Sequence, residues 1–139
     1  MNRISFELTP VGWVESPLTD RESAPKQGPE GSPEAWLVFE PWVLQGIEGI
    51  QAGDEVILLT WLDRARRDVL RTHPRDDASN PEQGVFNTRS PDRPNPIGLH
   101  RVTVAAIEGN RFRVRNLEAL HATPIVDVKP VLSEDVSER

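Results

Sequence analysis

The chain contains no cysteine, and this absence excludes disulfide bridges, thiolate nucleophiles and cysteine zinc sites. Long hydrophobic runs are absent as well. The longest covers residues 56–59 and resumes after Thr60 with Trp61 and Leu62, which is far too short to span a bilayer. The opening residues, MNRISFELTP, include no apolar core of a signal peptide. We therefore expect a soluble protein without a membrane partner, located in the cytoplasm.

The sequence motifs of several common enzyme sites are also missing. No Rossmann glycine fingerprint, Walker loop, paired His-Glu zinc motif or nucleophile elbow occurs. This argues against a cofactor fold of the usual α/β kind. The three histidines, His73, His100 and His121, are too scattered to predict a metal site, and we expect each to be a surface or packing residue. No bound metal is predicted.

Positive charge is in short supply overall. Twenty-two acidic residues outnumber sixteen basic ones, and the formal net charge is −6. This balance argues against a strong nonspecific nucleic-acid binder, whose surface is usually basic. The arginines are nevertheless concentrated in one part of the chain, at Arg64, Arg66, Arg67, Arg71 and Arg75. Taken alone, such a run is typical of a solvated face of a strand and loop.

Helices have little room, because thirteen prolines and nine glycines place turn signals along the whole chain. The sequence predicts an all-β fold in which the strands form one barrel or sandwich, with long loops and one or two short helical turns. No repeat or linker divides residues 1–139, so a single domain is predicted. The expected strands are Phe6–Trp13, Ala35–Phe39, Asp54–Leu62, Asp68–His73, Leu99–Ile107, Arg111–Leu117 and Thr123–Val131.

The clearest predicted hairpin joins the last two strands before residue 118. Glu108, Gly109 and Asn110 form its turn, and positive φ is expected at Gly109 and Asn110. In its second strand the arginines at 111, 113 and 115 alternate with Phe112 and Val114, so charged and apolar side chains are predicted on opposite faces. The continuous apolar run at residues 54–62 is typical of a buried central strand.

The remaining segments are predicted as loops and short helical turns. Loops are expected at Ser16–Pro33 and Pro74–Gln83, and helical turns at Trp42–Ile50 and Leu117–Ala122. In the first helical turn, the side chains that could face the core are Trp42, Leu44, Ile47 and Ile50. The four tryptophans, Trp13, Trp36, Trp42 and Trp61, are expected to be core anchors.

The segment from Gly84 to Leu99, GVFNTRSPDRPNPIGL, is the most unusual in composition. Its three prolines each fix φ near about −65°, carry no N–H, and push the preceding residue toward an extended conformation. The segment is therefore predicted to be neither helix nor central strand, and to be stiff before the chain folds. Gly98 would let the backbone approach a neighbouring group closely. The polar side chains that this stiff loop displays include Arg89, Ser90, Arg93 and Asn95.

Three interpretations of this loop are open from the residues alone. Guanidinium donors on a rigid turn suit a carboxylate or phosphate ligand, which they can bind through paired hydrogen bonds. A second interpretation is a structural turn whose arginines pair with acids such as Asp92. A third is a polyproline ligand for the aromatic groove of another protein.

The same segment closely resembles the signature of the TsaA-like (UPF0066) family. Characterised members include the S-adenosylmethionine-dependent enzyme that methylates threonylcarbamoyl-adenosine beside the anticodon of tRNA. Weaker similarities occur at Pro10–Pro17, Pro25–Gln27 and Leu117–Leu132. The resemblance covers residues 9–132 and leaves 133–139 as a polar tail. It implies a compact β-barrel that forms a homodimer, binds S-adenosylmethionine and acts on tRNA. The longer bacterial members carry an additional C-terminal region, and we expect the chain to end at Arg139 without it.

The resemblance also implies which residues form the site. The cofactor would contact residues of the signature and of the stretch before the last strand, namely Phe86, Arg89, Ser90, Pro91, Arg93, Asn95, Ile97, Gly98, Leu99, His121 and Thr123. Lys26 and Gln27 would contact the substrate if their loop folds back on the site. The sequence departs from the usual family pattern at Asp92, at His100, where serine is usual, and at Asn87, where alanine is usual.

Methyl transfer from a sulfonium needs little beyond correct positioning of donor and acceptor, so no metal is required. An amide-like acceptor nitrogen would benefit from a base or polarising group. Asp127 and Lys129 match the family's Asp-Ile-Lys-Pro segment and are the candidate catalytic pair. Their alternative role is a salt bridge that fixes the last strand. Two further functions stay open, namely a small-molecule acceptor and a non-enzymatic module that senses a nucleoside.

Overall fold

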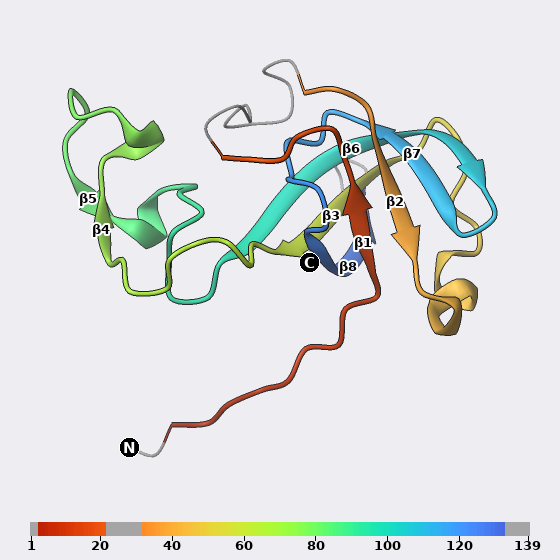
Figure 1. The fold of residues 1–139 in the computed structure, drawn as a ribbon, viewed down its shortest axis with the longest axis horizontal. Coiled ribbons are helices and arrows are strands. Elements are labelled where there is room, and N and C mark those ends of the chain that lie inside the picture. Colours follow the sequence, from red (N-terminus) through yellow and green to blue (C-terminus); the bar gives the residue numbers. More distant parts are fainter. Residues whose placement is uncertain (1–2, 22–31, 133–139) are drawn as a thin grey trace.

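The computed structural model describes residues 3–21 and 32–132, and six of its strands form a closed antiparallel barrel (Figure 1). In ring order these are β1 (Gly12–Glu15), β2 (Ala35–Phe39), β7 (Arg111–Arg115), β6 (Ile97–Glu108), β3 (Glu55–Trp61) and β8 (Pro124–Pro130). The ring closes where Gly12 and Trp13 of β1 pair with Ile125 and Pro124 of β8. The predicted all-β fold is confirmed, and of its two forms the barrel is the one observed.

Alternation along the strands supplies the core of the barrel. One side chain in two points inward, and the inward residues include Val14, Leu37, Phe39, Leu58, Val102, Val104, Phe112, Val114 and Ile125. Phe39 and Phe112 meet edge to face with their ring centroids 5.0 Å apart. Each such side chain, buried from water, stabilises the fold by about 1.5–3 kcal/mol.

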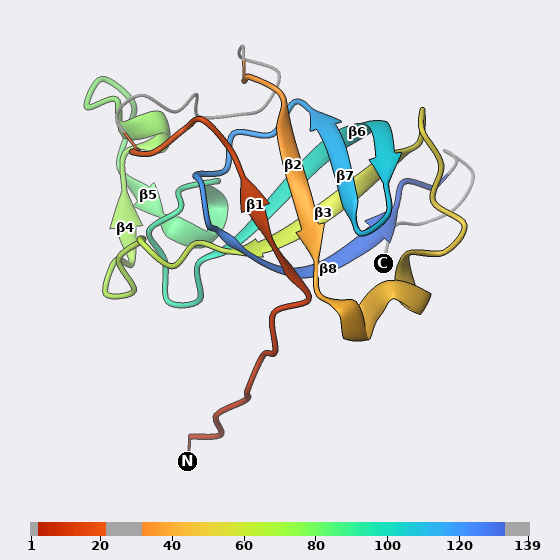
Figure 2. The ribbon, with the colours of Figure 1, turned by 45° about the vertical axis from the view of Figure 1, so that its right-hand side comes forward.

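The chain between β3 and β6, residues 62–96, forms a lobe beside the barrel (Figure 2). The lobe contains a two-stranded sheet of β4 (Arg71–Thr72) and β5 (Gln83–Gly84), with the 3-10 turns η3 (Pro74–Asp76) and η4 (Val85–Asn87). Trp61 and Ile97 are cross-strand partners, and the Leu62 N–H donates to the Pro96 carbonyl at 2.8 Å. The lobe therefore leaves and rejoins the barrel at a single place.

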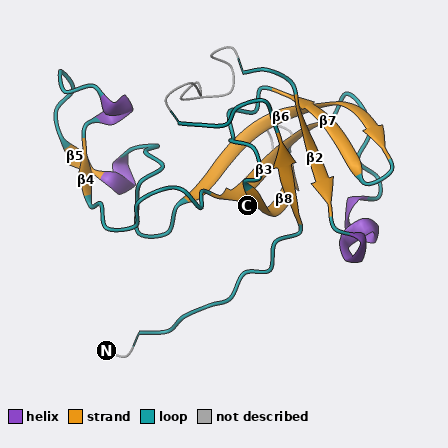
Figure 3. Cartoon of the chain, viewed as in Figure 1, coloured by secondary structure: helices purple, strands orange, loops and turns teal. Residues whose placement is uncertain are grey.

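The remaining helical turn, η2 (Pro41–Ile47), lies at the other end of the barrel (Figure 3). It confirms the turn predicted at Trp42–Ile50. However, Trp42 and Leu44 are exposed, and of the four apolar residues expected to face the core only Ile47 and Ile50 pack against it. No helix among the described residues has the length and apolar character needed to cross a membrane.

The expected role of the tryptophans as core anchors is wrong. Trp42 is 63% exposed, and the other three, Trp13, Trp36 and Trp61, are half-buried. The physical reason is strand parity, because all three occupy outward positions next to buried neighbours. Arg111 covers the Trp36 ring with its guanidinium carbon 4.8 Å from the ring centroid, and Arg67 covers the Trp61 ring at 5.2 Å, so these two rings pack under arginine on the outside of the barrel.

Most predicted strands are confirmed. Ala35–Phe39 has the predicted bounds, and the strands expected at Asp54–Leu62, Leu99–Ile107, Arg111–Leu117 and Thr123–Val131 have ends that differ by one or two residues. The β6–β7 hairpin is confirmed, with φ of 61° at Gly109. Asn110 does not adopt positive φ; its side-chain amide instead donates to the Phe39 carbonyl at 2.9 Å.

Two strand predictions are largely wrong. The strand expected at Phe6–Trp13 begins only at Gly12, since the residues before Pro10 have no partner strand among those described. The strand expected at Asp68–His73 is reduced to Arg71 and Thr72, because only β5 is available to pair with it. In both cases apolar and polar residues alternate in the sequence, but the described residues provide no neighbouring strand, or only a very short one, for the segment to pair with.

Two other boundaries also differ from prediction. Leu117–Ala122 is not helical, because the His121 and Ala122 N–H groups donate to the Leu18 and Val14 carbonyls, each at 2.7 Å, and not to carbonyls one helical turn earlier. Ile97 and Gly98, predicted as part of the loop before the strand Leu99–Ile107, begin the long strand β6. Pro96 is the last proline of the segment, and Ile97 pairs at once with Trp61, although the Ile97 N–H itself donates to the Asn95 carbonyl at 2.7 Å.

Candidate functional site

The stiff proline loop is held in place by the segment that follows β3. Arg67 donates from Nε to the Pro94 carbonyl at 2.7 Å and from Nη2 to the Asn95 side-chain oxygen at 2.9 Å. The Arg93 N–H donates to the Arg66 carbonyl at 3.0 Å. Trp61 lies beneath the Arg67 guanidinium, 5.2 Å from its carbon. The Asn95 side-chain oxygen therefore helps to hold the loop.

Asp92 ties this loop to the chain that leaves β1. Its two carboxylate oxygens accept from Arg21 Nη1 and Nη2 at 3.0 and 3.1 Å, and Oδ1 also accepts from the Arg66 N–H at 2.8 Å. Partial burial raises the pKa of the Asp92 carboxyl, but the hydrogen bonds from Arg21 and the Arg66 N–H, with the two arginine charges, lower it further, so the net pKa lies below its ordinary value. Asp92 is therefore an ionised anchor.

Arg93 is used inside the loop. Its guanidinium donates to the carbonyl oxygens of Val85, Thr88 and Ser90 at 3.0, 3.1 and 3.0 Å, and it lies over the exposed Phe86 ring at 5.9 Å. Three charge-assisted bonds to backbone make Arg93 a brace for the turn from η4 into the loop. The structural interpretation thus fits Arg93, although its partners are carbonyls and not acids.

Arg89 differs from the other arginines of the loop. It is exposed, and it makes no hydrogen bond or ion pair with any residue that the structure describes. Ser90, beside it, uses its N–H to bond the Thr88 hydroxyl at 3.2 Å and its carbonyl to bond Arg93. The loop therefore holds one guanidinium on a rigid backbone with its donors available to a ligand.

An apolar strip on the outside of the barrel continues from the lobe. Ile97 and Leu99 point outward from β6 and are 46% and 50% exposed. Leu99 pairs across the ladder with Leu59 of β3, and Leu59 pairs on its other side with Asp127 of β8. Since neighbouring strands lie about 4.8 Å apart, Leu99 and Asp127 are separated by about 10 Å on one face of the sheet.

The predicted catalytic pair lies at the edge of this strip. Lys129 is two residues after Asp127 on the same outward face, with its Nζ 3.5 Å from Asp127 Oδ2. The other Asp127 oxygen accepts from the Val128 N–H at 2.9 Å. Both side chains are about half exposed. The pair is accessible from solvent, and it also satisfies the salt bridge that the alternative interpretation requires.

Gly98 lies between these outward residues and points into the barrel. A Cβ at this position would collide with the Thr60 hydroxyl and lie 2.7 Å from His100 Nε2. His100 is buried, with Nε2 bonded to Thr60 Oγ1 at 2.7 Å and Nδ1 bonded to Glu118 Oε1 at 2.5 Å. The predicted close approach at Gly98 is thus to this polar group inside the protein, and His100 is a packing residue.

His121 and Thr123 lie at the same end of the barrel but are used internally. His121 Nδ1 accepts from the Ser16 N–H at 3.2 Å, and its carbonyl accepts from Arg64 at 3.4 Å. Thr123 is buried and donates its hydroxyl to the Leu120 carbonyl at 2.7 Å. The predicted substrate contacts Lys26 and Gln27 lie outside the described residues. No group of three or more potential metal-ligating side chains occurs within residues 3–21 and 32–132.

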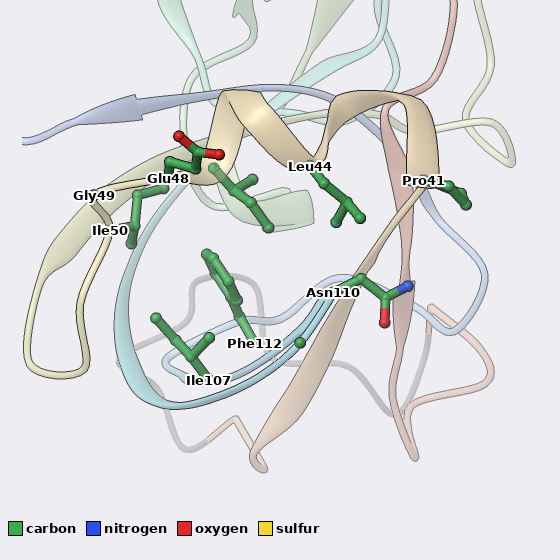
Figure 4. A pocket seen from close by; sticks show the side chains of 10 residues that line it. Pro41, Leu44, Glu48, Gly49, Ile50, Ile107, Asn110 and Phe112 are labelled. Atoms are coloured by element: carbon green, nitrogen blue, oxygen red, sulfur yellow. The ribbon is translucent and has the colours of Figure 1, made fainter.

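A hollow of another kind lies at the far end of the barrel (Figure 4). This apolar cleft of about 590 Å³ separates η2 from the β6–β7 hairpin, with Leu44 on one side and Ile107 and Phe112 on the other. None of the residues predicted for the site lines it. The candidate site is therefore the open surface that starts at the lobe end with Phe86, Arg89, Ile97 and Leu99 and continues along the outside of the sheet to Asp127. Lys129 pairs with Ile57, farther from the lobe, and lines a second hollow of about 730 Å³ that residues 46–50 also line.

Comparison with known families decides the assignment. The model of the tRNA-methyltransferase O N-terminal domain matches residues 13–135. The chain belongs to this family. The TrmO N-terminal family thus confirms the resemblance based on the proline loop, and the matched region includes the barrel, the lobe and every described residue of the candidate site.

Relatives of this TrmO-type domain include archaeal proteins of similar length. A probable S-adenosyl-L-methionine-binding protein of Methanothermobacter thermautotrophicus is 39% identical over 130 residues, covering 94% of this chain and 93% of the relative. An S-adenosyl-L-methionine-binding protein of Archaeoglobus fulgidus is 40% identical over 122 residues, covering 88% and 86%. The crystal structure of TrmO from Pseudomonas aeruginosa has the same fold, with a TM-score of 0.73 at 24% identity over 98% of this chain. This chain spans 61% of that TrmO chain.

The residues that sequence reasoning missed are those that hold the TrmO-type loop. Arg67 and Arg21 position the loop from outside it, whereas Arg93, which the sequence analysis named as a cofactor contact, braces the loop from within. Arg67 and its ring partner Trp61 appear in the sequence only as members of an arginine run and of an apolar strand. No local signal connects Arg21 with Asp92, because 71 residues separate them.

Proposed function

We propose that this chain binds S-adenosylmethionine at the lobe end of the barrel and transfers its methyl group to a threonylcarbamoyl-type adenosine in tRNA. The observation that carries the proposal is that a TrmO-family domain presents, on its rigid signature loop, a guanidinium, Arg89, that bonds no residue in the described part of the chain. Two of the relatives are named for S-adenosylmethionine binding, which supports the choice of cofactor.

The side chains of the site fit the chemical groups of this cofactor. Arg89 can bind its α-carboxylate through two parallel hydrogen bonds, because its guanidinium is exposed and bonds none of residues 3–21 and 32–132. The exposed apolar surfaces of Phe86, Ile97 and Leu99 suit the adenine ring and the methionine carbons. The carboxylate of Asp127, on the same outward face as Leu99, offers a negative charge to the sulfonium.

The bound cofactor supplies an activated methyl group for in-line displacement, so the protein has mainly to position the acceptor. Asp127 is our candidate to accept the proton of the acceptor nitrogen, because its Oδ2 reaches solvent on the outward face. Lys129, 3.5 Å from that oxygen, would keep the carboxylate oriented and then contact the anionic substrate. Lys26 and Gln27 remain proposed substrate contacts.

A second candidate function is supported by the relatives and by charge. The two archaeal relatives, 39% and 40% identical, are named for S-adenosylmethionine binding and not for methyl transfer. The net charge of this chain, −6, is also unusual for an RNA-binding surface. In this alternative the same site binds the cofactor and the acceptor is a small molecule, or the protein senses a nucleoside without catalysis.

Two measurements test these proposals in sequence. Calorimetric titration with S-adenosylmethionine is expected to show saturable binding, and the absence of heat at millimolar cofactor would contradict both functions. Cofactor labelled in its methyl group is then incubated with total tRNA and, as a control, with tRNA that lacks the threonylcarbamoyl group. Label in the first RNA alone supports methyl transfer to that nucleoside, whereas cofactor binding without labelled RNA supports the second function.

The catalytic assignment has its own test. Asp127→Asn keeps the size of the side chain but removes its charge, and we expect methyl transfer to fall by about 10²- to 10⁴-fold, the usual contribution of a general base. Glu108→Gln, an exposed carboxylate at the hairpin turn, is the matched control and should leave the rate unchanged. Equal rates in the two variants would assign Asp127 to the salt bridge alone.

A further inference from the structure

Phe86 is a large apolar side chain that the fold leaves open to solvent. It is 78% exposed, although Val85 before it is buried. One face of the ring is covered, since the Arg93 guanidinium carbon lies over it at 5.9 Å from the centroid. The three backbone carbonyls that accept from Arg93 fix that guanidinium in place. Phe86 therefore presents its other face to a planar ligand on a fixed support.

The next residue, Asn87, places a side-chain amide beside this ring. Asn87 is exposed at the end of η4, and its Nδ2 donates to Gln83 Oε1 of β5 at 2.5 Å. This bond uses one of the two N–H groups on Nδ2. Within the described residues, Asn87 Oδ1 and the second N–H make no other hydrogen bond, so both can meet a ligand.

The bond to Gln83 also sets the direction in which the Asn87 amide faces. Turning the Asn87 amide over alone would bring its Oδ1 against Gln83 Oε1, which are two acceptors without a proton between them. The amide therefore holds a donor and an acceptor in fixed places, next to the exposed face of Phe86.

A donor and an acceptor beside an aromatic face are the features that recognise adenine. An asparagine amide accepts from the adenine N6–H and donates to N7, and this pairing distinguishes adenine from the other bases. Stacking on an aromatic ring adds affinity that does not depend on the base, because every base has a π-face. Hypoxanthine, which has an oxygen at position 6, would place an acceptor against Asn87 Oδ1.

We propose that Phe86 and Asn87, with Gln83 orienting the amide, bind the adenine ring of S-adenosylmethionine, so that Phe86 stacks on the ring and Asn87 bonds N6 and N7. This inference rests on the proposed function. The cofactor fits better than the acceptor, since the threonylcarbamoyl group of the acceptor occupies the N6 nitrogen that Asn87 would bond. Arg89 lies three residues after Phe86, at most about 10 Å along the chain, which places its guanidinium near the carboxylate end of the same cofactor.

Calorimetric titration with two forms of the cofactor tests the assignment. S-adenosylmethionine is compared with its analogue that carries hypoxanthine in place of adenine. The natural chain is expected to bind the adenine form about ten- to a hundredfold more tightly, the usual value of one paired contact to a base edge. Asn87→Ala should lose most of this preference, because binding of the adenine form weakens while binding of the hypoxanthine form changes little.

Two further variants separate stacking from recognition of the base edge. Phe86→Ala should weaken both forms alike, by about tenfold, because stacking does not depend on the groups at the edge. Gln45→Ala removes an exposed amide from η2, at the other end of the barrel, and is the matched control that should leave both affinities unchanged. Thermal unfolding verifies that all variants are folded, as expected at exposed positions.

The unfavourable results are distinct from one another. An Asn87→Ala chain that keeps the natural preference, or that loses affinity for both forms equally, would overturn the adenine assignment while cofactor binding still supported the proposed function. A natural chain that binds both forms equally would overturn it as well. No binding of either form by the natural chain would contradict the assignment and the proposed function together.

Discussion

Arg89 and Arg93 illustrate what single residues reveal and what they conceal. The sequence predicted a stiff loop that displays both guanidinium groups, and nothing in their immediate neighbours distinguishes them, because each lies close to a proline. In the structure Arg93 bonds three backbone carbonyls while Arg89 bonds no described residue. The difference depends on how the turn at η4 curls around one side chain, which is a three-dimensional property that local propensity does not encode.

The two arginines should therefore respond differently to removal. Arg89→Ala is expected to weaken S-adenosylmethionine binding by about 2 kcal/mol, roughly thirtyfold, with little change in melting temperature. Arg93→Ala should lower the melting temperature by several degrees, since three carbonyls lose their charged donor. Calorimetry and thermal unfolding of both variants check the prediction. Loss of stability in Arg89→Ala with unchanged affinity would assign that residue to the scaffold.

Asp92 gives the loop a dependence on pH. Its pKa is lowered in the folded protein, so its stabilising contribution is complete above the ordinary carboxyl pKa of about 3.9 and is lost as the pH falls through the lower folded value. Asp92→Asn should cost about 1 kcal/mol at neutral pH, a modest figure because the Arg21 partner is partly exposed. The difference in stability from the natural chain should shrink below about pH 4.

Unfolding by denaturant between about pH 3 and pH 7 measures this difference. Asp63→Asn removes an equal charge from an exposed side chain that bonds no described residue, and is the matched control. An Asp92→Asn penalty that stays constant down to the acid end of that range would show that the ion pair with Arg21 contributes nothing measurable.

At the scale of elements, the sequence predicts strands well where both periodicity and a neighbouring strand exist. Ala35–Phe39, the central β3 and the β6–β7 hairpin follow from alternation and turn chemistry. Phe6–Trp13 and Asp68–His73 carry the same kind of alternation, but the partner strand that would complete them is absent from the described residues or very short. The tryptophans were assigned to the core because they are large, although strand parity places Trp13, Trp36 and Trp61 outward.

For a single strand, we predict how a substitution at Gly98 in β6 changes stability. Adding a Cβ there forces the strand against Thr60 and the buried His100, and we expect Gly98→Ala to lower the free energy of unfolding by about 1–3 kcal/mol. Gly84→Ala, in β5, meets nothing within 4 Å and should be nearly neutral. Denaturant unfolding of the two variants gives the comparison. Equal stabilities would mean that Thr60 and His100 move aside without cost.

At the scale of the whole molecule, the net charge does not show how unevenly the charged residues are distributed. The net charge of −6 argued against nonspecific nucleic-acid binding, yet arginines cluster in the lobe. Arginines of both regions have acidic partners, since Arg71 bonds Glu82 at 2.7 Å in the lobe, while Arg113 and Arg115 of the hairpin share Glu34 at 3.5 and 3.6 Å. The sequence predicted the face on which these hairpin arginines lie, but it could not predict their acidic partner on a distant segment.

If tRNA is the substrate, the lobe should supply its phosphate contacts. Replacing Arg71 and Arg75 together by alanine is expected to reduce the slope of log affinity against log salt by up to about 2, because each arginine would neutralise one phosphate. The double replacement of Arg113 and Arg115 is the control and should change the slope little. Filter binding of tRNA between about 50 and 300 mM salt measures both slopes. Equal slopes would move the RNA contact away from the lobe.

The pairing of Trp61 with Ile97 has a consequence for how such proteins can diverge. The chain departs and returns through adjacent rungs of one ladder, and the barrel closes without any strand from the intervening segment. An insertion attached at one strand pair in this way can be lengthened, shortened or exchanged while the barrel that supports it stays the same. Differences in acceptor choice among relatives should therefore concentrate in the lobe, residues 62–96. Grafting the lobe from one relative onto the barrel of another is a direct way to transfer specificity for the acceptor.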